Sequence, residues 1–285
     1  MNLEPCYFNI PRSARNQPVY RIISLKRLHE MFEKRVNTLV NPIMWDDPFE
    51  NFIKGFKGQL PSGDVVEFAQ RHDFYGQCWT HVGASDAMWR IYSSDKQSVR
   101  IKVRLKTLVE TLAPRAHGIV LVGRVRYLHS EGLLKWAKRV FRSSDAPDVR
   151  LLGRTLLVKR MAFSHEQEVR ILYFDSRNEG SRNLFSYRFD PHAFVEEILV
   201  DPRLSADQAT SLSNEIRAKT GFRGPIAHSN LYAPPQELTL RLGAAYSSLK
   251  RASYRKVVSK EPVLRASDVT PVDSIWLPVR DLRFT

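Results

Sequence analysis

Residues 19–32 read VYRIISLKRLHEMF, and this stretch contains the local signals for a strand followed directly by a helix. The β-branched and aromatic residues of its first positions predict the strand. Ser24 then stands where a hydroxyl side chain caps the first turn of a helix. The apolar positions of that helix fall on one face: Leu25, Leu28, Met31 and Phe32. The stretch therefore predicts one β-strand joined to one amphipathic helix.

Further strands and helices follow in irregular order. Apolar alternation and short apolar runs predict strands at 36–40, 75–80, 99–103, 119–128, 168–174, 184–189 and 197–200. Caps and helical periodicity predict helices after Ser85, near 132–141, from Pro147 to near 160, and from Ser205 to Lys219. This order predicts an α+β fold with a mixed or antiparallel sheet core and packed helices, and not a doubly wound sheet. We expect an irregular lead-in at 1–17, a globular domain at 18–235 and a basic C-terminal tail at 236–285.

The positive charge of the chain is high and unevenly distributed. The sequence has 44 Lys and Arg against 30 Asp and Glu, a net charge of +14, and residues 100–170 contain 16 basic and 6 acidic side chains. A concentrated basic surface attracts nucleic acid or another polyanion, although a merely solubilising surface is the alternative. In the helix near 132–141 the basic side chains lie opposite the apolar ones. We expect four of them to bind nucleic acid: Lys135, Lys138, Arg139 and Arg142.

Several common kinds of site are absent from the sequence. There is no GxGxxG or GxSxG pattern, and the pattern that begins at His165 has Val169 where a second zinc ligand would stand. Cys6 and Cys78 form neither a metal-binding pair nor a disulfide framework. No apolar run is long enough for a signal peptide or a membrane span. We expect a cytoplasmic protein without a bound metal, and its oligomeric state stays open.

Polar and aromatic side chains in two early segments are candidates for a binding site. Arg21 interrupts an apolar strand, and its planar guanidinium suits phosphate or carboxylate, although an edge-strand Arg in solvent is the alternative. Thr80 ends a predicted strand. The next helix has Trp89 and Tyr92 three positions apart, a spacing that suits a stacking wall for a flat ring. Core packing, with only Tyr92 reaching a cleft, is the alternative.

The late segment EQEVR, residues 166–170, is the third candidate. On a strand, Glu166, Glu168 and Arg170 share one face, and Arg170 is the candidate cation that holds the two carboxylates together. Such a pair can stabilise a cationic transition state, as carboxylates do at an oxocarbenium centre. A solvated charge ladder is the alternative. The acidic loop at 46–50, DDPFE, offers either Mg²⁺ ligands or a structural turn.

These segments, in this order, resemble a bacterial family named domain of unknown function 2971. The stretches that carry the resemblance are YRIISLKRLHEMF, NPIMWDDPFE, CWT with MWRIY, and KRMAFSHEQEVRIL. They span residues 18–232, which is most of the chain. The activity of that family is not established, so this resemblance supplies no reaction.

The order of polar residues also resembles the ADP-ribosyltransferase superfamily, in which a basic residue on the first strand, Ser, Thr or Tyr on a second and Glu on a late strand form the site. This resemblance implies that NAD is a substrate. It places Tyr20 and Arg21 on NAD, with Arg21 at the diphosphate or ribose. It implies that Thr80 braces Arg21 or the glutamate, and that Trp89 or Tyr92 packs on nicotinamide.

The same resemblance gives the two glutamates separate roles. Glu168 would bind the ribose hydroxyl and stabilise the oxocarbenium ion as nicotinamide leaves, and Glu166 would orient the acceptor. Arg21 completes the catalytic set that it implies.

Three functions remain open from the sequence. An NAD-consuming, ADP-ribosyltransferase-like enzyme that modifies nucleic acid in bacterial defence or stress response accounts for both the polar positions and the basic stripe. A non-catalytic nucleic-acid-binding module accounts for the charge alone. A metal-dependent nuclease would use Asp46, Asp47, Glu166 and Glu168 around Mg²⁺. We expect the first of these.

Overall fold

The computed structural model describes residues 3–45, 57–59, 62–67, 73–142, 148–177 and 183–232. The chain divides into two units, Met1–Tyr232 and Ala233–Thr285, and every described residue belongs to the first. The acidic loop at 46–50 and the predicted basic tail at 236–285 lie outside the described residues.

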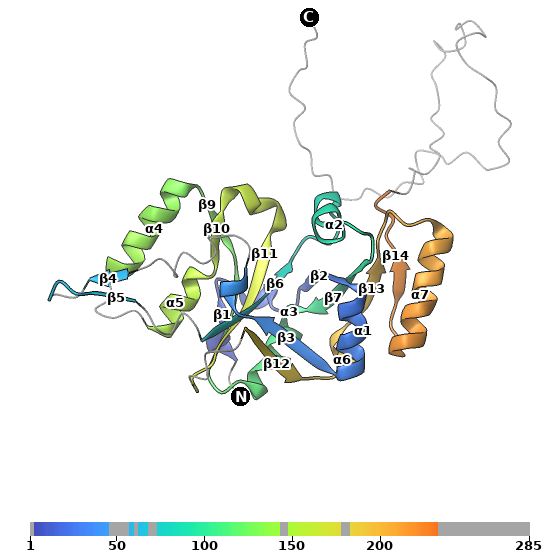
Figure 1. Cartoon of the computed structure of the whole chain (residues 1–285), viewed down its shortest axis with the longest axis horizontal. Helices are drawn as coiled ribbons and strands as arrows, with labels where there is room; N and C mark the ends of the chain where they lie inside the picture. Colours follow the sequence, from blue (N-terminus) through green and yellow to red (C-terminus); the bar gives the residue numbers. More distant parts are fainter. Residues whose placement is uncertain are drawn as a thin grey trace, which may run out of the picture. The chain divides into compact units, whose positions relative to one another are not determined.

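A mixed β-sheet forms the centre of the first unit (Figure 1). The strands of the described residues are β1 (Tyr7–Phe8), β2 (Pro18–Ser24), β3 (Val36–Val40), β4 (Lys57–Gln59), β5 (Val65–Glu67), β6 (Phe74–Thr80), β7 (Ser98–Arg104), β8 (Ile119–Arg124), β9 (Arg126–Leu128), β10 (Val158–Arg160), β11 (Glu168–Phe174), β12 (Leu184–Arg188), β13 (Glu197–Val200) and β14 (Ile226–His228). Ten of them form one sheet in the order β1-β8-β11-β6-β2-β7-β13-β14, with β3 pairing β6 and β12 pairing β3. The pairs β1–β8 and β13–β14 are parallel, whereas β2, β6 and β11 are antiparallel neighbours.

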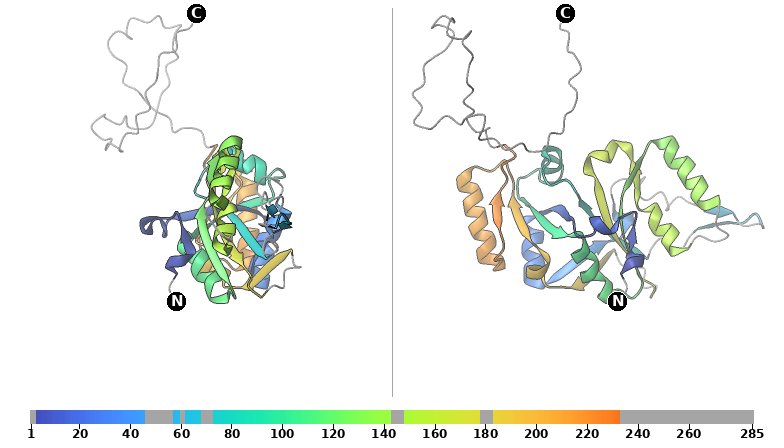
Figure 2. Two further views of the ribbon diagram at one scale, coloured as in Figure 1. Left: turned by 90° about the vertical axis from the view of Figure 1, so that its left-hand side faces the viewer. Right: turned by 180° about the vertical axis from the view of Figure 1, so that it is seen from behind.

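Helices cover both faces of this sheet. They are α1 (Leu25–Lys34), α2 (Asp86–Tyr92), α3 (Leu105–Leu112), α4 (Ser130–Arg142), α5 (Val149–Thr155), α6 (Pro191–Phe194) and α7 (Ala206–Thr220). Seen from behind, α7 lies at one end of the sheet, beside β13 and β14, and α4 and α5 lie at the other end (Figure 2). The predicted α+β class with a mixed sheet core and packed helices is confirmed.

Each face of the sheet is covered by its own apolar cluster. The larger cluster includes buried side chains of α1, α3, α6 and α7, and the smaller one includes those of α5. Along β11, Val169 and Ile171 belong to the larger cluster, whereas Leu172 and Phe174 belong to the smaller one. Because side chains alternate along a strand, Glu168 and Arg170 share the α5 face with Leu172.

Local signals located several elements correctly. The Ser24 side chain accepts a hydrogen bond from the Arg27 N–H at the start of α1. Ser205 and Gln208 form the predicted capping box, and Gly221 ends α7 with a positive φ of 64°. By contrast, α3 was not predicted, because it follows β7 directly and Arg104 at its N-cap makes no side-chain cap.

Two predicted elements are corrected by the structure around β9 and β10. The strand predicted at 119–128 breaks at Val125, whose N–H donates to the carbonyl oxygen of Glu168, so β8 and β9 belong to different sheets. The helix predicted to continue to near 160 ends at Thr155. The carbonyl oxygen of Leu157 accepts from the Arg126 N–H, and the next residues form β10, which pairs with β9.

Candidate functional site

Three of the motif-bearing strands meet in register at one end. Glu168, the first residue of β11, lies opposite Thr80 at the end of β6. Thr80 in turn lies opposite Tyr20 of β2. Directly paired residues of antiparallel strands point to the same face of the sheet. Glu168, Thr80 and Tyr20, which are far apart in sequence, therefore share one face.

Glu166 reaches the same place by a different route from the predicted one. It is the last residue of a 3₁₀ helix, η7 (Met161–Glu166), and β11 begins only at Glu168, so Glu166 is not on the strand. Gln167 between them has a left-handed backbone with φ of 42°. The Thr80 hydroxyl donates to the Glu166 carbonyl oxygen at 2.5 Å. Thr80 therefore fixes the turn that presents Glu166.

A lysine joins the two carboxylates, and an arginine pairs with one of them. The Lys159 ammonium on β10 lies 2.5 Å from Glu166 Oε2 and 2.7 Å from Glu168 Oε1. Arg170 Nε donates to Glu168 Oε2 at 2.7 Å. We call these four residues the carboxylate cluster. Arg170, the predicted cation, pairs with Glu168, whereas the cation that contacts both carboxylates is Lys159, which the sequence did not indicate.

The carboxylate cluster is buried and braced from several sides. Arg170 is fully buried, and its Nη1 donates to the Leu156 carbonyl oxygen at 2.8 Å. Its guanidinium also lies 4.5 Å from the centre of the Trp45 ring, and the Lys159 ammonium lies 4.4 Å from that of Phe163. Removing one member of such a buried network costs about 3–5 kcal/mol, because a charge then remains without its partner. The predicted alternative of a solvated charge ladder is therefore excluded.

Burial and neighbouring charges give the two carboxyl groups different pKa values. Burial, and then the neighbouring Glu168, raise the pKa of Glu166 to about 7 even though Lys159 opposes the change. Burial acts to raise the pKa of Glu168 as well, but the Arg170 guanidinium and the hydrogen bonds from its neighbours hold that pKa well below its usual range. At neutral pH the cluster thus contains one firmly ionised carboxylate and one that exchanges its proton near that pH.

A cavity of about 570 Å³ lies beside this cluster, and we call it the glutamate pocket. Its wall includes Tyr20, His81, Arg124, Tyr127 and Glu168. The hydroxyl oxygen of Tyr127 accepts from the Glu168 N–H at 2.8 Å. Arg124 Nε is buried and has no hydrogen-bond partner among the described residues. The pocket therefore offers aromatic walls, one arginine side chain and Glu168 from the carboxylate cluster.

The aromatic pair of α2 divides between the core and the site. Trp89 is only 1% exposed and is packed inside the protein. Tyr92 is 47% exposed, and its hydroxyl donates to Glu166 Oε1 at 2.9 Å. The alternative from the sequence, in which the helix packs through Trp89 and only Tyr92 reaches the site, describes this arrangement.

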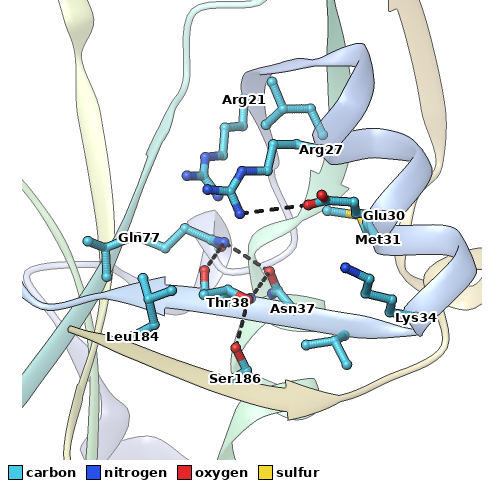
Figure 3. A pocket seen from close by; sticks show the side chains of 13 residues that line it. Arg21, Arg27, Glu30, Met31, Lys34, Asn37, Thr38, Gln77, Leu184 and Ser186 are labelled. Carbon is cyan, nitrogen blue, oxygen red and sulfur yellow. Dashed lines mark hydrogen bonds and ion pairs between the residues drawn. The ribbon is translucent and has the colours of Figure 1, made fainter. Parts of the chain in front are cut away.

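Arg21 does not join Thr80 and Glu168. It follows Tyr20 on β2, so its side chain points to the opposite face of the sheet. There it lines a separate cavity between α1 and the strands (Figure 3). The expected convergence is therefore partial: the structure brings Tyr20, Thr80, Tyr92 and the carboxylates together and leaves Arg21 outside.

The predicted basic helix lies next to β10. Lys135, Lys138 and Arg139 of α4 are exposed, whereas Leu133 and Ala137 on its other face are buried. The side chain of Arg142 lies outside the described residues. Because α4 packs against β9 and β10, this basic surface is one element away from Lys159.

Two further features concern only the described part of the chain. Within it, no group of three or more His, Cys, Asp or Glu side chains is arranged to hold a metal ion. No helix in these ranges combines the length and the apolar character needed to cross a membrane. Asp46 and Asp47, the other carboxylates of the nuclease hypothesis, lie outside the described residues.

No protein-family model matches the chain, and no curated protein matches it, so membership of the domain of unknown function 2971 family stays a prediction. The chain is similar to solved structures of Thermus sp. 2.9 DarT. The complex with NAD⁺ has a TM-score of 0.35 and 15% identity over 78% of this chain and 98% of that chain. The complex with carba-NAD⁺ has a TM-score of 0.34 and 17% identity over 78% and 97% of the two chains. The complex with ADP-ribosylated ssDNA has a TM-score of 0.36 and 14% identity over 79% and 97%. TM-scores this low do not establish a shared fold, so a function has to be argued from this chain's own residues.

Proposed function

We propose that the protein is an NAD-consuming, ADP-ribosyltransferase-like enzyme that modifies nucleic acid. The observation that carries the proposal is the buried pair of carboxyl groups with different pKa values, of which Glu168 lines the glutamate pocket. Two neighbouring carboxyls whose environments push their pKa values apart can divide the work of one reaction between them. Thermus DarT was solved with NAD⁺ and with ADP-ribosylated ssDNA, but the proposal rests on the cluster itself.

Each carboxyl group fits one half of the reaction. The bond between the ribose C1′ and the nicotinamide nitrogen breaks, and nicotinamide leaves as a neutral molecule with the bonding electron pair. The positive charge that develops on the ribose is stabilised by ionised Glu168. A nucleophilic atom of the acceptor then bonds to C1′, and Glu166 takes the proton that this atom loses, which its pKa near 7 allows.

The glutamate pocket supplies the binding groups for NAD in this proposal. Tyr20 and Tyr127 offer rings on which a flat group can pack. The Arg124 side chain lines the pocket, and its guanidinium would bind the diphosphate. Arg124 thus takes the role that the superfamily resemblance gave to Arg21, because Arg21 is on the other face.

The exposed basic side chains of α4 supply the surface for the acceptor. A nucleic acid bound there lies close to β10 and therefore to the carboxylate cluster. Replacing Lys135 and Lys138 together by Gln should weaken binding of single-stranded DNA and lower the slope of log affinity against log salt by about 1.4. An unchanged salt slope in a filter-binding or anisotropy titration would place the nucleic acid elsewhere.

Release of nicotinamide from NAD⁺ tests the proposed reaction. The purified protein is assayed with and without single-stranded DNA or RNA, beside Glu168→Gln and a matched control, Glu215→Gln. Glu215 lies on α7 and pairs with Lys219, so this control removes a carboxylate that is not part of the carboxylate cluster. We expect Glu168→Gln to lose turnover and Glu215→Gln to keep it, with circular dichroism showing that both variants fold.

The same assay separates the enzyme from a plain binding module. Full turnover by a folded Glu168→Gln protein refutes the proposed role of Glu168. No turnover by the wild-type protein with any nucleic acid, together with salt-dependent DNA binding, leaves the non-catalytic nucleic-acid-binding module as the better account.

A further inference from the structure

β2 and β3 form a fork along one edge of β6. β11 pairs with the whole length of β6, so β2 and β3 share the other edge. There β2 pairs with β6 only at Thr80, and β3 pairs with it only at Gly76. At the base of the fork Gln77 of β6 bonds to β3: its Nε2 donates to Asn37 Oδ1 at 2.9 Å and to the Thr38 carbonyl oxygen at 3.1 Å.

A cavity of about 330 Å³ lies over this fork, between the strands and α1, and we call it the fork pocket (Figure 3). It is on the opposite face of the sheet from the carboxylate cluster, because Gln77 and Arg21, which line it, alternate along their strands with Cys78 and Tyr20. No residue of the carboxylate cluster lines the fork pocket. It is therefore a separate cavity.

Two guanidinium groups face the space inside the fork pocket. Figure 3 shows Arg21 from β2 and Arg27 from α1 extending side by side above Gln77. Arg21 makes no hydrogen bond or ion pair with any described residue, and its burial, with the charge of Arg27 nearby, lowers its pKa. The acidic residue in the wall, Glu30, is 4.0 Å from Arg27 and so gives little compensation.

This arrangement is costly unless an anion completes it. Arg21 is partly buried. A guanidinium partly withdrawn from water without a partner is less stable than one in solvent, and a second like charge beside it adds to the cost. Lys34 contributes a third positive charge to the wall, so the lining has three cations and one carboxylate. A guanidinium fork binds two oxygens of a phosphate at once, which relieves both effects.

The rest of the wall indicates what the anion is attached to. Ile23, Met31, Val36, Val40 and Leu184 give the pocket an apolar side. A cavity with cations on one side and aliphatic side chains on another fits a small molecule with a phosphate group and an apolar or flat body.

We propose that the fork pocket binds a small phosphorylated molecule and that Arg21 anchors its phosphate group. The site is distinct from the glutamate pocket, so it does not depend on the reaction proposed above.

Calorimetric titration with inorganic phosphate and with phenyl phosphate tests the proposal on the full-length protein. We expect phenyl phosphate to bind more tightly than inorganic phosphate, because its ring contacts the aliphatic wall. Arg21→Gln should weaken its binding by at least about tenfold, the loss expected for a charge-assisted hydrogen bond. Lys26→Gln is the matched control, because Lys26 is an exposed cation on α1 outside the pocket wall. Benzoate distinguishes a phosphate site from a general anion site.

A second measurement tests the proposal through the stability of the protein instead of its affinity for the ligand. Arg21→Met replaces an uncompensated cation by an apolar side chain of similar length, so it should raise the denaturation midpoint of the ligand-free protein and remove the stabilisation that phenyl phosphate gives. The proposal is overturned if Arg21→Gln and Lys26→Gln bind phenyl phosphate equally well, or if benzoate binds as tightly as phenyl phosphate. The fork pocket and the glutamate pocket are not separate sites if Glu168→Gln abolishes phenyl phosphate binding, or if Arg21→Gln raises the KM for NAD⁺. Failure of nicotinamide release alone leaves this proposal untouched.

Discussion

Replacing Glu166 by Gln should remove a pH dependence of stability from the protein. Glu166 is buried, and burial beside Glu168 raises its pKa from the ordinary 4.5 to about 7. A carboxyl group with a higher pKa in the folded state stabilises the fold fully below its unfolded pKa, and loses that contribution as the pH rises through the folded pKa. In the wild-type protein this contribution therefore declines between about pH 4.5 and about pH 7.

The size of the effect follows from the same shift. At about 1.36 kcal/mol for each step of one in pKa, a rise from 4.5 to about 7 corresponds to about 3 kcal/mol. Glu168 has a lowered pKa, so its contribution is lost only as the pH falls below this window. Burial lowers the pKa values of His29 and His81, which gives an opposite slope inside the window. Their slope cancels when the variant is compared with the wild type.

Urea unfolding across this pH range measures the difference. We expect the stability of Glu166→Gln relative to the wild type to rise by up to about 3 kcal/mol from about pH 4.5 to above about pH 7. Glu131→Gln, at an exposed position of α4, controls for the loss of one carboxylate. If the curves of Glu166→Gln and the wild type run parallel, Glu166 does not have the raised pKa, and its proposed role as proton acceptor is refuted.

Two further changes test the architecture of the site and of the sheet. Lys159→Met leaves the two bridged carboxylates without their shared cation, so it should lower the free energy of unfolding by about 3–5 kcal/mol. A loss below about 1 kcal/mol in urea unfolding would show that the bridge is not formed. Gly118→Ala would place a Cβ 2.0 Å from the Phe174 carbonyl oxygen, whereas a Cβ at Gly132 meets nothing closer than 3.8 Å. Thermal unfolding should show a loss of about 3 kcal/mol or more for Gly118→Ala and a gain of up to about 1 kcal/mol for Gly132→Ala in α4, and equal effects would contradict the pairing of β8 with β11.

Elements with strong local signals were predictable from the sequence. Ser24 and the alternation before it located β2 and α1, and the Ser205 capping box located α7. The fold class followed from the order of these elements. α3 and β10 were missed because their boundaries are set by tertiary contacts: α3 has no side-chain cap, and β10 exists only as the partner of β9.

The sequence indicated which residue types form the site, but not how the fold brings them together. Glu166, Glu168 and Arg170 are close in sequence, so their association was visible. Lys159 was placed near the end of a predicted helix, where a lysine is ordinary and gives no signal. Its approach to Glu166, seven residues further along the chain, depends on η7, which turns the chain back.

The alternation of side chains along β2 decides which of its residues belong to the same site. Tyr20 and Arg21 are neighbours on β2, yet Tyr20 lies level with Thr80 and Glu168, whereas Arg21 faces the fork pocket. Motif order alone groups both with the glutamate, because sequence patterns do not record which face a side chain takes. β6 divides in the same way, with Thr80 fixing the Glu166 turn on one face and Gln77 bonding to β3 on the other. Because β2 lines both cavities, substitutions at its adjacent positions 20 and 21 test the two sites separately.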